Sequence, residues 1–134
     1  TASVVANMRF MIHQPMKESL EIIKNIAKKH DVEMNILYAH DCSKITDINN
    51  KNYKYVCSCI HDVFEDVKPT PYIMLGGTDS RHYTRICDSV IRFSPLKITN
   101  QQLQSVHAID ENISMDALYD AVRFYRYFIE NYNK

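Results

Sequence analysis

The sequence has no net charge and no long hydrophobic run, and each absence excludes a class of protein. Lys and Arg together number 16, as do Asp and Glu, so the formal net charge at pH 7 is zero. A protein that binds nucleic acid or an anionic membrane through its overall charge would be strongly basic. No apolar stretch approaches the length of a membrane-spanning helix, and the opening residues 1–5 lack the charged start of a signal peptide. We therefore expect a cytoplasmic protein that binds neither nucleic acid nor a membrane.

Cysteines are few and do not form a recognisable metal or redox motif. The chain has four, and Cys57 and Cys59 form a C-x-C pair rather than the C-x-x-C of zinc knuckles and redox sites. We expect reduced thiols with structural roles in a reducing compartment. The apolar fraction of 46% is ordinary for a globular protein. The chain is therefore predicted to be one small domain or a piece of a larger protein.

Glycine is scarce, and the two glycines are adjacent at Gly76 and Gly77. The apolar run 71–75 leads into them, and a polar cluster follows that contains Thr78, Asp79, Arg81 and His82. A strand, a glycine turn and a helix are how α/β proteins build a ligand site at the carboxyl end of a strand. The glycines would allow backbone angles or a close approach that a Cβ forbids. The alternative is a tight turn whose polar residues are solvated.

Hydrophobic periodicity predicts an α/β chain in two units. We predict strands at 3–12, 32–38, 72–75 and 88–93, and helices at 15–29, 53–67, 80–86 and 114–132. The polar stretch 41–52 is a plausible linker. The elements before it have the order of a βαβ unit. We place the two units at 1–45 and 46–134.

The apolar spacing also predicts which helix faces are buried. In the first helix the stripe is Leu20, Ile23 and Ala27, with Ile22 and Ile26 beside it. In the last helix, for which Ser114 is a natural N-cap, the predicted stripe is Met115, Leu118, Val122, Tyr125 and Ile129.

Two further positions have side chains suited to ligand chemistry. Arg9 lies inside an apolar strand, where it must reach solvent, form an ion pair or meet an anionic ligand. Arginine is well suited to bidentate capture of a carboxylate. His107 lies in a loop with Asp110 and Glu111, a set that could supply one metal ligand and the groups that orient it. One histidine is not a metal site, and a surface or helix-capping role is the alternative.

These segments together resemble a known family. They are Asn7-Met8-Arg9, then Gly76-Gly77-Thr78-Asp79-Ser80-Arg81, then Ile91-Arg92-Phe93-Ser94-Pro95, and finally His107-Ala108-Ile109-Asp110-Glu111. Their order and spacing resemble the C-terminal part of the co-catalytic zinc peptidases of the carboxypeptidase S, aminoacylase and succinyl-diaminopimelate desuccinylase family. The resemblance implies an α/β fold. Residues 1–45 would be the second half of a lid or dimerisation domain, and residues 46–134 the C-terminal part of the catalytic domain.

The resemblance also implies a role for individual residues. His107 would be a zinc ligand, and Glu111 would orient the loop that carries it. Arg9 would bind the substrate carboxylate, and Gly77 and Thr78 would line the substrate pocket. Asp79 and Arg81 would fix the turn. The chain departs from the family pattern at Ala108, where glycine or serine is usual, and at Asn112, where arginine is usual. Both departures would alter the loop without removing the ligand.

The function that the resemblance implies is hydrolysis of an amide bond next to a free carboxylate, in a peptide or an N-acyl amino acid. Full-length members use two zinc ions and commonly form homodimers through the lid. The sequence contains no His-x-Asp and no Glu-Glu, the motifs that supply other ligands and the general base. We therefore expect no catalytic residue in this chain and no activity from it alone. The alternative is a non-enzymatic small α/β module that binds an anionic small molecule through the glycine turn or mediates self-association.

Overall fold

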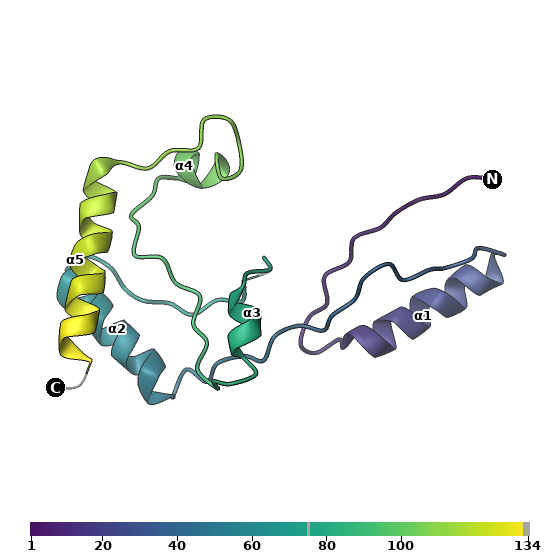
Figure 1. The fold of residues 1–134 in the computed structure, drawn as a ribbon, viewed down its shortest axis with the longest axis horizontal. Coiled ribbons are helices and arrows are strands. Elements are labelled where there is room, and N and C mark those ends of the chain that lie inside the picture. The colour runs from purple at the N-terminus through teal and green to yellow at the C-terminus, as the bar shows by residue number, and fades with distance from the viewer. Residues whose placement is uncertain (75, 133–134) are drawn as a thin grey trace.

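The chain is rich in helix and elongated (Figure 1). A computed structural model describes residues 1–74 and 76–132. Its helices are α1 (Met16–Lys29), α2 (Lys51–Val63), α3 (Ser80–Tyr83), α4 (Asn100–Gln104) and α5 (Met115–Asn131). Figure 1 shows α1 lying apart from α2 and α5, which cross each other near the C-terminus. The division at 45/46 stays a prediction.

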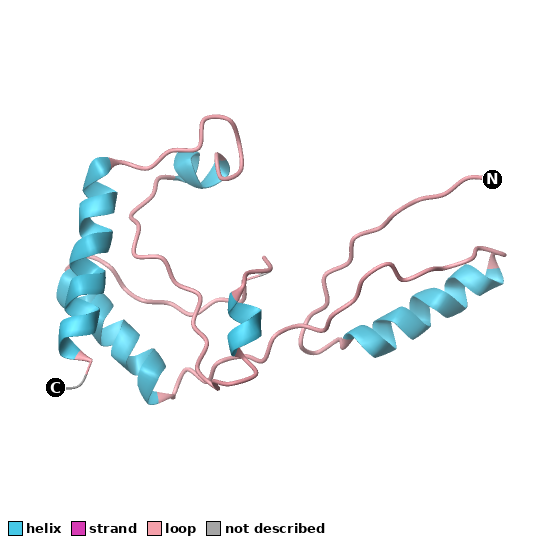
Figure 2. Cartoon of the chain, viewed as in Figure 1, coloured by secondary structure: helices cyan, strands magenta, loops and turns pink. Residues whose placement is uncertain are grey.

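The predicted strands are not strands in the described residues, where Figure 2 shows loops between the helices. The one β-type pairing there is an isolated bridge in which the Gln14 N–H donates to the Met11 carbonyl at 2.9 Å. Segments 3–12, 32–38 and 88–93 are irregular, as are residues 72–74 of the fourth segment, whose last residue, Leu75, lies outside the described part. A strand needs a neighbour whose main-chain groups pair with its own, and no such ladder forms among the described residues.

The helix predictions are largely confirmed. The α1 helix begins one residue after Pro15, as a proline at its start favours, and α5 begins after Ser114, whose hydroxyl accepts from the Ala117 N–H at 3.1 Å. Two predicted helices end early, α2 at Val63 and α3 at Tyr83. The α4 helix was not predicted, although Thr99 and Gln102 form a capping box at its start.

The core lies between α2 and α5. Its most buried side chains are Cys59, Ile60, Val63 and Phe64 from α2 and its C-cap, and Ala117, Ala121 and Phe124 from α5. The Phe124 ring stacks on Phe64 with centroids 6.0 Å apart and contacts Phe93 at 5.2 Å. Arg123 donates to the Val63 carbonyl at 2.9 Å and satisfies the last turn of α2. Burial raises the pKa of the Cys59 thiol, as expected for an inert structural cysteine.

The predicted buried face of α5 is wrong for this structure. Met115, Leu118, Val122, Tyr125 and Ile129 are all exposed, by 44% to 73%. The α5 helix packs on α2 through Ala117, Ala121 and Phe124, because two alanines let the helices approach and Phe124 fills the space between them. The helix therefore carries a second apolar face that nothing in the described residues covers.

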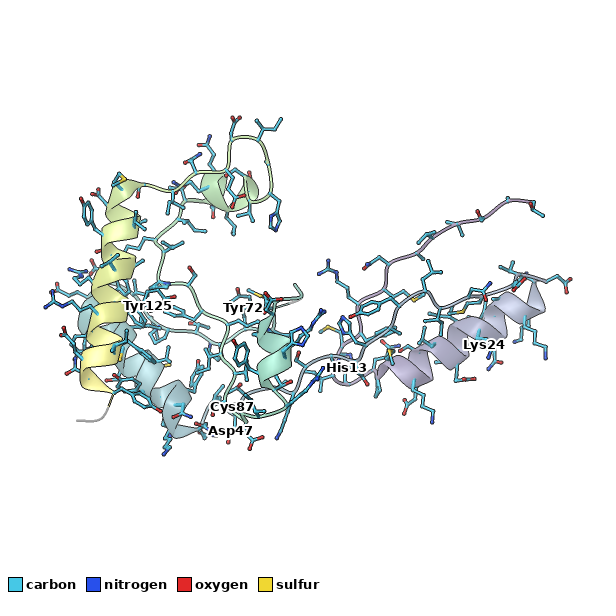
Figure 3. All side chains as sticks on the ribbon, in the orientation of Figure 1. His13, Lys24, Asp47, Tyr72, Cys87 and Tyr125 are labelled. Carbon is cyan, nitrogen blue, oxygen red and sulfur yellow. The ribbon has the colours of Figure 1, made fainter. Side chains whose placement is uncertain are left out.

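Much other apolar surface is open. The accessible surface is 11593 Å², whereas a compact monomer of 15.7 kDa exposes about 7300 Å². Val4, Val5, Leu37 and Ile86 are each more than 80% exposed. Figure 3 shows side chains such as the labelled Lys24 projecting from α1, which stands away from the α2–α5 core. No helix in the described part of the chain combines the length and hydropathy that crossing a membrane requires. Open apolar surface of this extent is typical of an interaction surface.

Candidate functional site

The glycine turn and the Arg9 segment line one open concavity of about 900 Å³. Arg9, Gly77, Thr78 and Arg81 are among its lining residues. Asp79, His107 and Glu111 are not, although Asp79 is next to Thr78 in the chain. The structure thus brings together the residues expected to bind a carboxylate, and leaves the candidate metal ligand in a separate loop.

The described chain does not itself require the two glycines, and the close approach that they would allow to a ligand stays a prediction. Neither Gly76 nor Gly77 has a positive φ. A Cβ on Gly76 would lie 3.8 Å from the Met74 side chain, an ordinary contact, and a Cβ on Gly77 would meet nothing within 4 Å. Neither unusual backbone angles nor crowding within the described chain therefore requires them. Gly77 lines the concavity, so its main chain is accessible to a ligand bound there.

Arg92 holds the glycine turn in place. Its Nε–H is shared between the Ser80 hydroxyl at 2.7 Å and the Thr78 hydroxyl at 3.1 Å, and its Nη2 donates to the Ser43 hydroxyl at 3.1 Å. The Thr78 and Ser80 hydroxyls are hydrogen-bonded to each other. One half-buried guanidinium thus joins the turn to a segment more distant in the sequence.

A second arginine in this region contacts two histidines. The Arg81 Nε donates to the His82 Nε2 at 3.3 Å, and its Nη1 lies 3.3 Å from the His40 Nε2. Arg81 therefore links the start of α3 to the loop that follows residue 38. Asp79 is the N-cap residue of α3, but its side chain makes no capping hydrogen bond. The turn-fixing roles expected of Asp79 and Arg81 stay predictions, and these contacts support the one for Arg81.

The segment that carries Ser43 is tied to the segment that carries Arg92. Thr46 and Val90 exchange two hydrogen bonds, with the Thr46 hydroxyl donating at 2.8 Å and the Val90 N–H donating back at 3.0 Å. Lys44 Nζ and Asp88 Oδ1 are 2.6 Å apart. This hydrogen-bonded pair raises the pKa of Lys44 and lowers the pKa of Asp88. Both side chains are exposed, so the pair fixes geometry more than it stabilises the fold.

The His107 loop is ordered by its own hydrogen bonds. His107 has φ 68°, a left-handed conformation uncommon for a residue with a side chain. Its N–H donates to Glu111 Oε2 at 2.8 Å, and the Ala108 N–H donates to the Ser105 carbonyl at 2.8 Å. The Asn112 amide donates to the Asp110 carbonyl at 2.6 Å. Glu111 thus makes a contact of the kind expected for orienting this loop, and the role itself stays a prediction.

The described residues alone do not make a metal centre. Among them no group of three or more His, Cys, Asp or Glu side chains could hold a metal ion. A zinc ion in a protein takes about four ligands. His107 can therefore contribute to a zinc site only where residues beyond the described ones supply the other ligands.

Sequence reasoning missed Arg92 and Ser43 as parts of this region. Arg92 lies in a segment that resembles the family motif, but the motif alone assigns it no role. Like Arg9, it lies in an apolar run, where an arginine needs a partner or a ligand. No sequence signal marks Ser43, because its contact depends on how segments 43–46 and 88–92 dock.

Comparison with known proteins gives relatives along nearly the whole chain. PM20D1 of Xenopus tropicalis, an N-fatty-acyl-amino acid synthase/hydrolase, is 32% identical over 132 residues, which cover 98% of this chain and 26% of the relative. The human protein of the same name is 31% identical over 131 residues, covering 94% and 26%. Probable carboxypeptidase S-like 2 of Dictyostelium discoideum is 33% identical over 90 residues, 67% of this chain and 17% of the relative.

No known family profile and no solved structure matches the chain. The chain spans about a quarter of the length of the first two relatives. Because the similarity to them extends over nearly all of its residues, the chain belongs to the carboxypeptidase S/aminoacylase family of peptidases.

Proposed function

We propose that the full-length protein hydrolyses an amide bond next to a free carboxylate, in a peptide or an N-acyl amino acid, and that this chain supplies the carboxylate-binding part. One observation carries the proposal: Arg9, Gly77 and Thr78 come from segments far apart in the sequence and line one concavity. A guanidinium, a hydroxyl and open main chain that line the same concavity are groups suited to binding a carboxylate. The relatives' names, N-fatty-acyl-amino acid synthase/hydrolase and carboxypeptidase S-like, agree with substrates of this type.

In this proposal the residues of the chain bind and position the substrate. Arg9 holds the carboxylate, and the Gly77 main chain and Thr78 hydroxyl contact it from the opposite side. Fixing that end of the substrate would position the amide bond for attack, a contribution that lowers the entropic part of the barrier. The general base belongs to a part of the protein outside this chain.

We further propose that the full-length protein is a zinc enzyme with His107 as one ligand. When bound, two zinc ions would polarise the amide carbonyl and activate water. The described residues do not complete such a site, so His107 would act together with ligands from the rest of the protein. The Glu111 hydrogen bond to the His107 main chain would set the direction of the loop.

The proposal extends to the architecture of the whole protein. Segments 3–12, 32–38, 72–75 and 88–93 would become strands when neighbouring strands are present, giving the α/β fold. The exposed stripe on α5 and the exposed side chains of residues 1–45 would then be covered, in part by a second subunit in a homodimer formed through the lid. The four free thiols would suit a protein of a reducing compartment such as the cytoplasm.

The test is hydrolysis of an N-acyl amino acid by the full-length protein and by its Arg9→Ala and Arg9→Lys variants. We expect Arg9→Ala to raise KM at least about tenfold, because it removes a charged partner of the carboxylate, and Arg9→Lys to raise KM less. Zinc content should be the same in all three. A KM that does not change in Arg9→Ala would contradict the assignment. The isolated chain should have no activity, and chelator-sensitive hydrolysis by it would contradict the assignment of the general base to the remainder.

A further inference from the structure

Arg92 has an unusual set of partners for a half-buried charge. Within the described residues its hydrogen-bond acceptors are three hydroxyls, those of Thr78, Ser80 and Ser43, and no carboxylate. Hydroxyls orient a guanidinium but do not neutralise it. Its positive charge is therefore not neutralised, and it acts on the turn that carries Thr78 and on the concavity beside that turn.

The protons of this cluster can be assigned from hydrogen-bond chemistry. Thr78 and Ser80 are bonded to each other, and each hydroxyl has one proton, so one of them is the donor. Ser80 lies closer to the Arg92 Nε, at 2.7 Å against 3.1 Å for Thr78. A hydroxyl that accepts from a cation becomes a better donor, which favours Ser80 as the one that donates to Thr78.

This assignment leaves the Thr78 hydroxyl proton without a protein acceptor. Thr78 is exposed and lines the concavity, whereas Ser80 is half-buried. The Thr78 oxygen accepts from both Ser80 and Arg92, so its own proton points to the remaining side, and both contacts make it more acidic. A carboxylate is a strong acceptor for such a donor.

We propose that Arg92 is a positioning residue that acts through Ser80 and Thr78 to select a carboxylate ligand. Although Arg92 also lines the concavity, its guanidinium is engaged by three hydroxyls and acts on the ligand through them. It fixes the turn against Ser43, orients the Thr78 hydroxyl proton toward the concavity and strengthens it as a donor. This inference takes the identity of the ligand, a carboxylate, from the proposed function. It adds Arg92 to the residues of the site and assigns the Thr78 hydroxyl as a hydrogen-bond donor to the ligand.

The experiment is equilibrium binding to the full-length protein, measured by calorimetry. The probes are N-benzenesulfonyl-phenylalanine, which has the carboxylate but no scissile acyl bond, and its carboxamide. We expect Arg92→Lys to weaken binding of the acid about tenfold and binding of the carboxamide less than about twofold, because only the acid uses the strengthened donor. Ser80→Ala, which leaves the guanidinium in place, should show the same selective loss.

Arg85→Lys is the matched control, because Arg85 is exposed and does not line the concavity. It should bind both probes as the wild type does. An equal loss for acid and carboxamide in Arg92→Lys would show a merely structural role and overturn the proposal, as would an unchanged affinity for the acid. Failure of the proposed hydrolysis would appear separately, as a wild-type protein that binds the acid in preference to the carboxamide but does not cleave N-acyl amino acids.

Discussion

The hydroxyl of Tyr55 on α2 donates a hydrogen bond to the main-chain carbonyl of Phe128 on α5, at 2.6 Å. The two rings also pack against each other with centroids 5.1 Å apart. This pair fixes one end of the α2–α5 core, and Phe124 fills its middle. The structured part of the chain therefore depends on a polar contact as well as on aromatic packing.

Replacing Tyr55 with Phe should loosen α2 without removing its packing. The lost hydrogen bond costs about 1 kcal/mol, so amide hydrogen exchange in residues 51–63 of the full-length protein should become about fivefold faster. Tyr119→Phe on α5 is the control, because Tyr119 is 67% exposed. Equal exchange in Tyr55→Phe and wild type would show that this hydrogen bond does not hold the helices together.

The Tyr55–Phe128 pair also predicts that the α2–α5 core becomes less stable at alkaline pH. Burial raises the pKa of Tyr55 from its ordinary 10.0 to about 12. A folded-state pKa above the unfolded value means that stabilisation is complete below pH 10 and is lost as the pH rises toward 12. Exchange in residues 51–63 should therefore accelerate across that range more steeply in wild type than in Tyr55→Phe. Parallel pH profiles would contradict this assignment.

The exposed stripe of α5 should be covered in the full-length protein. Met115 is 63% exposed and Tyr125 49% exposed in the structure described here. If the remainder of the protein packs on this face, peroxide should oxidise Met115 more slowly in the full-length protein than in the isolated chain. Mass spectrometry of the tryptic peptide measures both rates. Equal rates would mean that the stripe faces solvent in both.

Substitution of Gly77 separates folding from ligand binding. A Cβ there meets nothing within 4 Å, so Gly77→Ala should change stability by less than about 0.5 kcal/mol. The methyl group would occupy space beside the concavity, and KM for an N-acyl amino acid should rise severalfold in the full-length protein. Gly76→Ala is the comparison within the same turn: among the described residues its Cβ would contact Met74, so the methyl group is partly screened and the effect on KM should be smaller. A lower thermal midpoint with unchanged KM would oppose this view.

The Glu111 contact predicts that zinc affinity falls by different amounts in two Glu111 variants. Glu111→Ala removes the acceptor of the His107 N–H, whereas Glu111→Gln keeps a carbonyl oxygen in its place. In the full-length protein, zinc affinity should fall about tenfold in the alanine variant and much less in the glutamine variant. Competition with a chromophoric chelator measures both. Equal losses in Glu111→Gln and Glu111→Ala would indicate that the charge, and not the hydrogen bond, is what matters.

The sequence predicts an element of the fold when the residues that determine that element are close together in the chain. The start of α5 is determined locally by its N-cap residue, Ser114, and the start of α1 follows Pro15. The strands depend on partners distant in the sequence, and the described residues do not supply them. The face that α5 turns to α2 also depends on tertiary packing, because the helix has an apolar stripe on each of two sides and periodicity alone does not choose between them.

The candidate site also combines residues that the sequence predicts with contacts that depend on tertiary packing. Arg9, Gly77 and Thr78 could be proposed from residue types and order, and the structure places them around one concavity. The contacts of Arg92 with Ser43 and of Arg81 with His40 arise from docking of distant segments, so the sequence could not reveal them. His40 is exposed, and its Nε2 lies 3.3 Å from the Arg81 Nη1.

The most direct test compares hydrolysis of an N-acyl amino acid and its carboxamide by the full-length wild-type protein. The account predicts that the acid is cleaved with a kcat/KM about a hundredfold higher or more, because the charged partners in the concavity would be left unpaired by the neutral analogue. Equal cleavage of the two, or cleavage of neither, would contradict the claim that this chain supplies the carboxylate-binding part of an amide hydrolase.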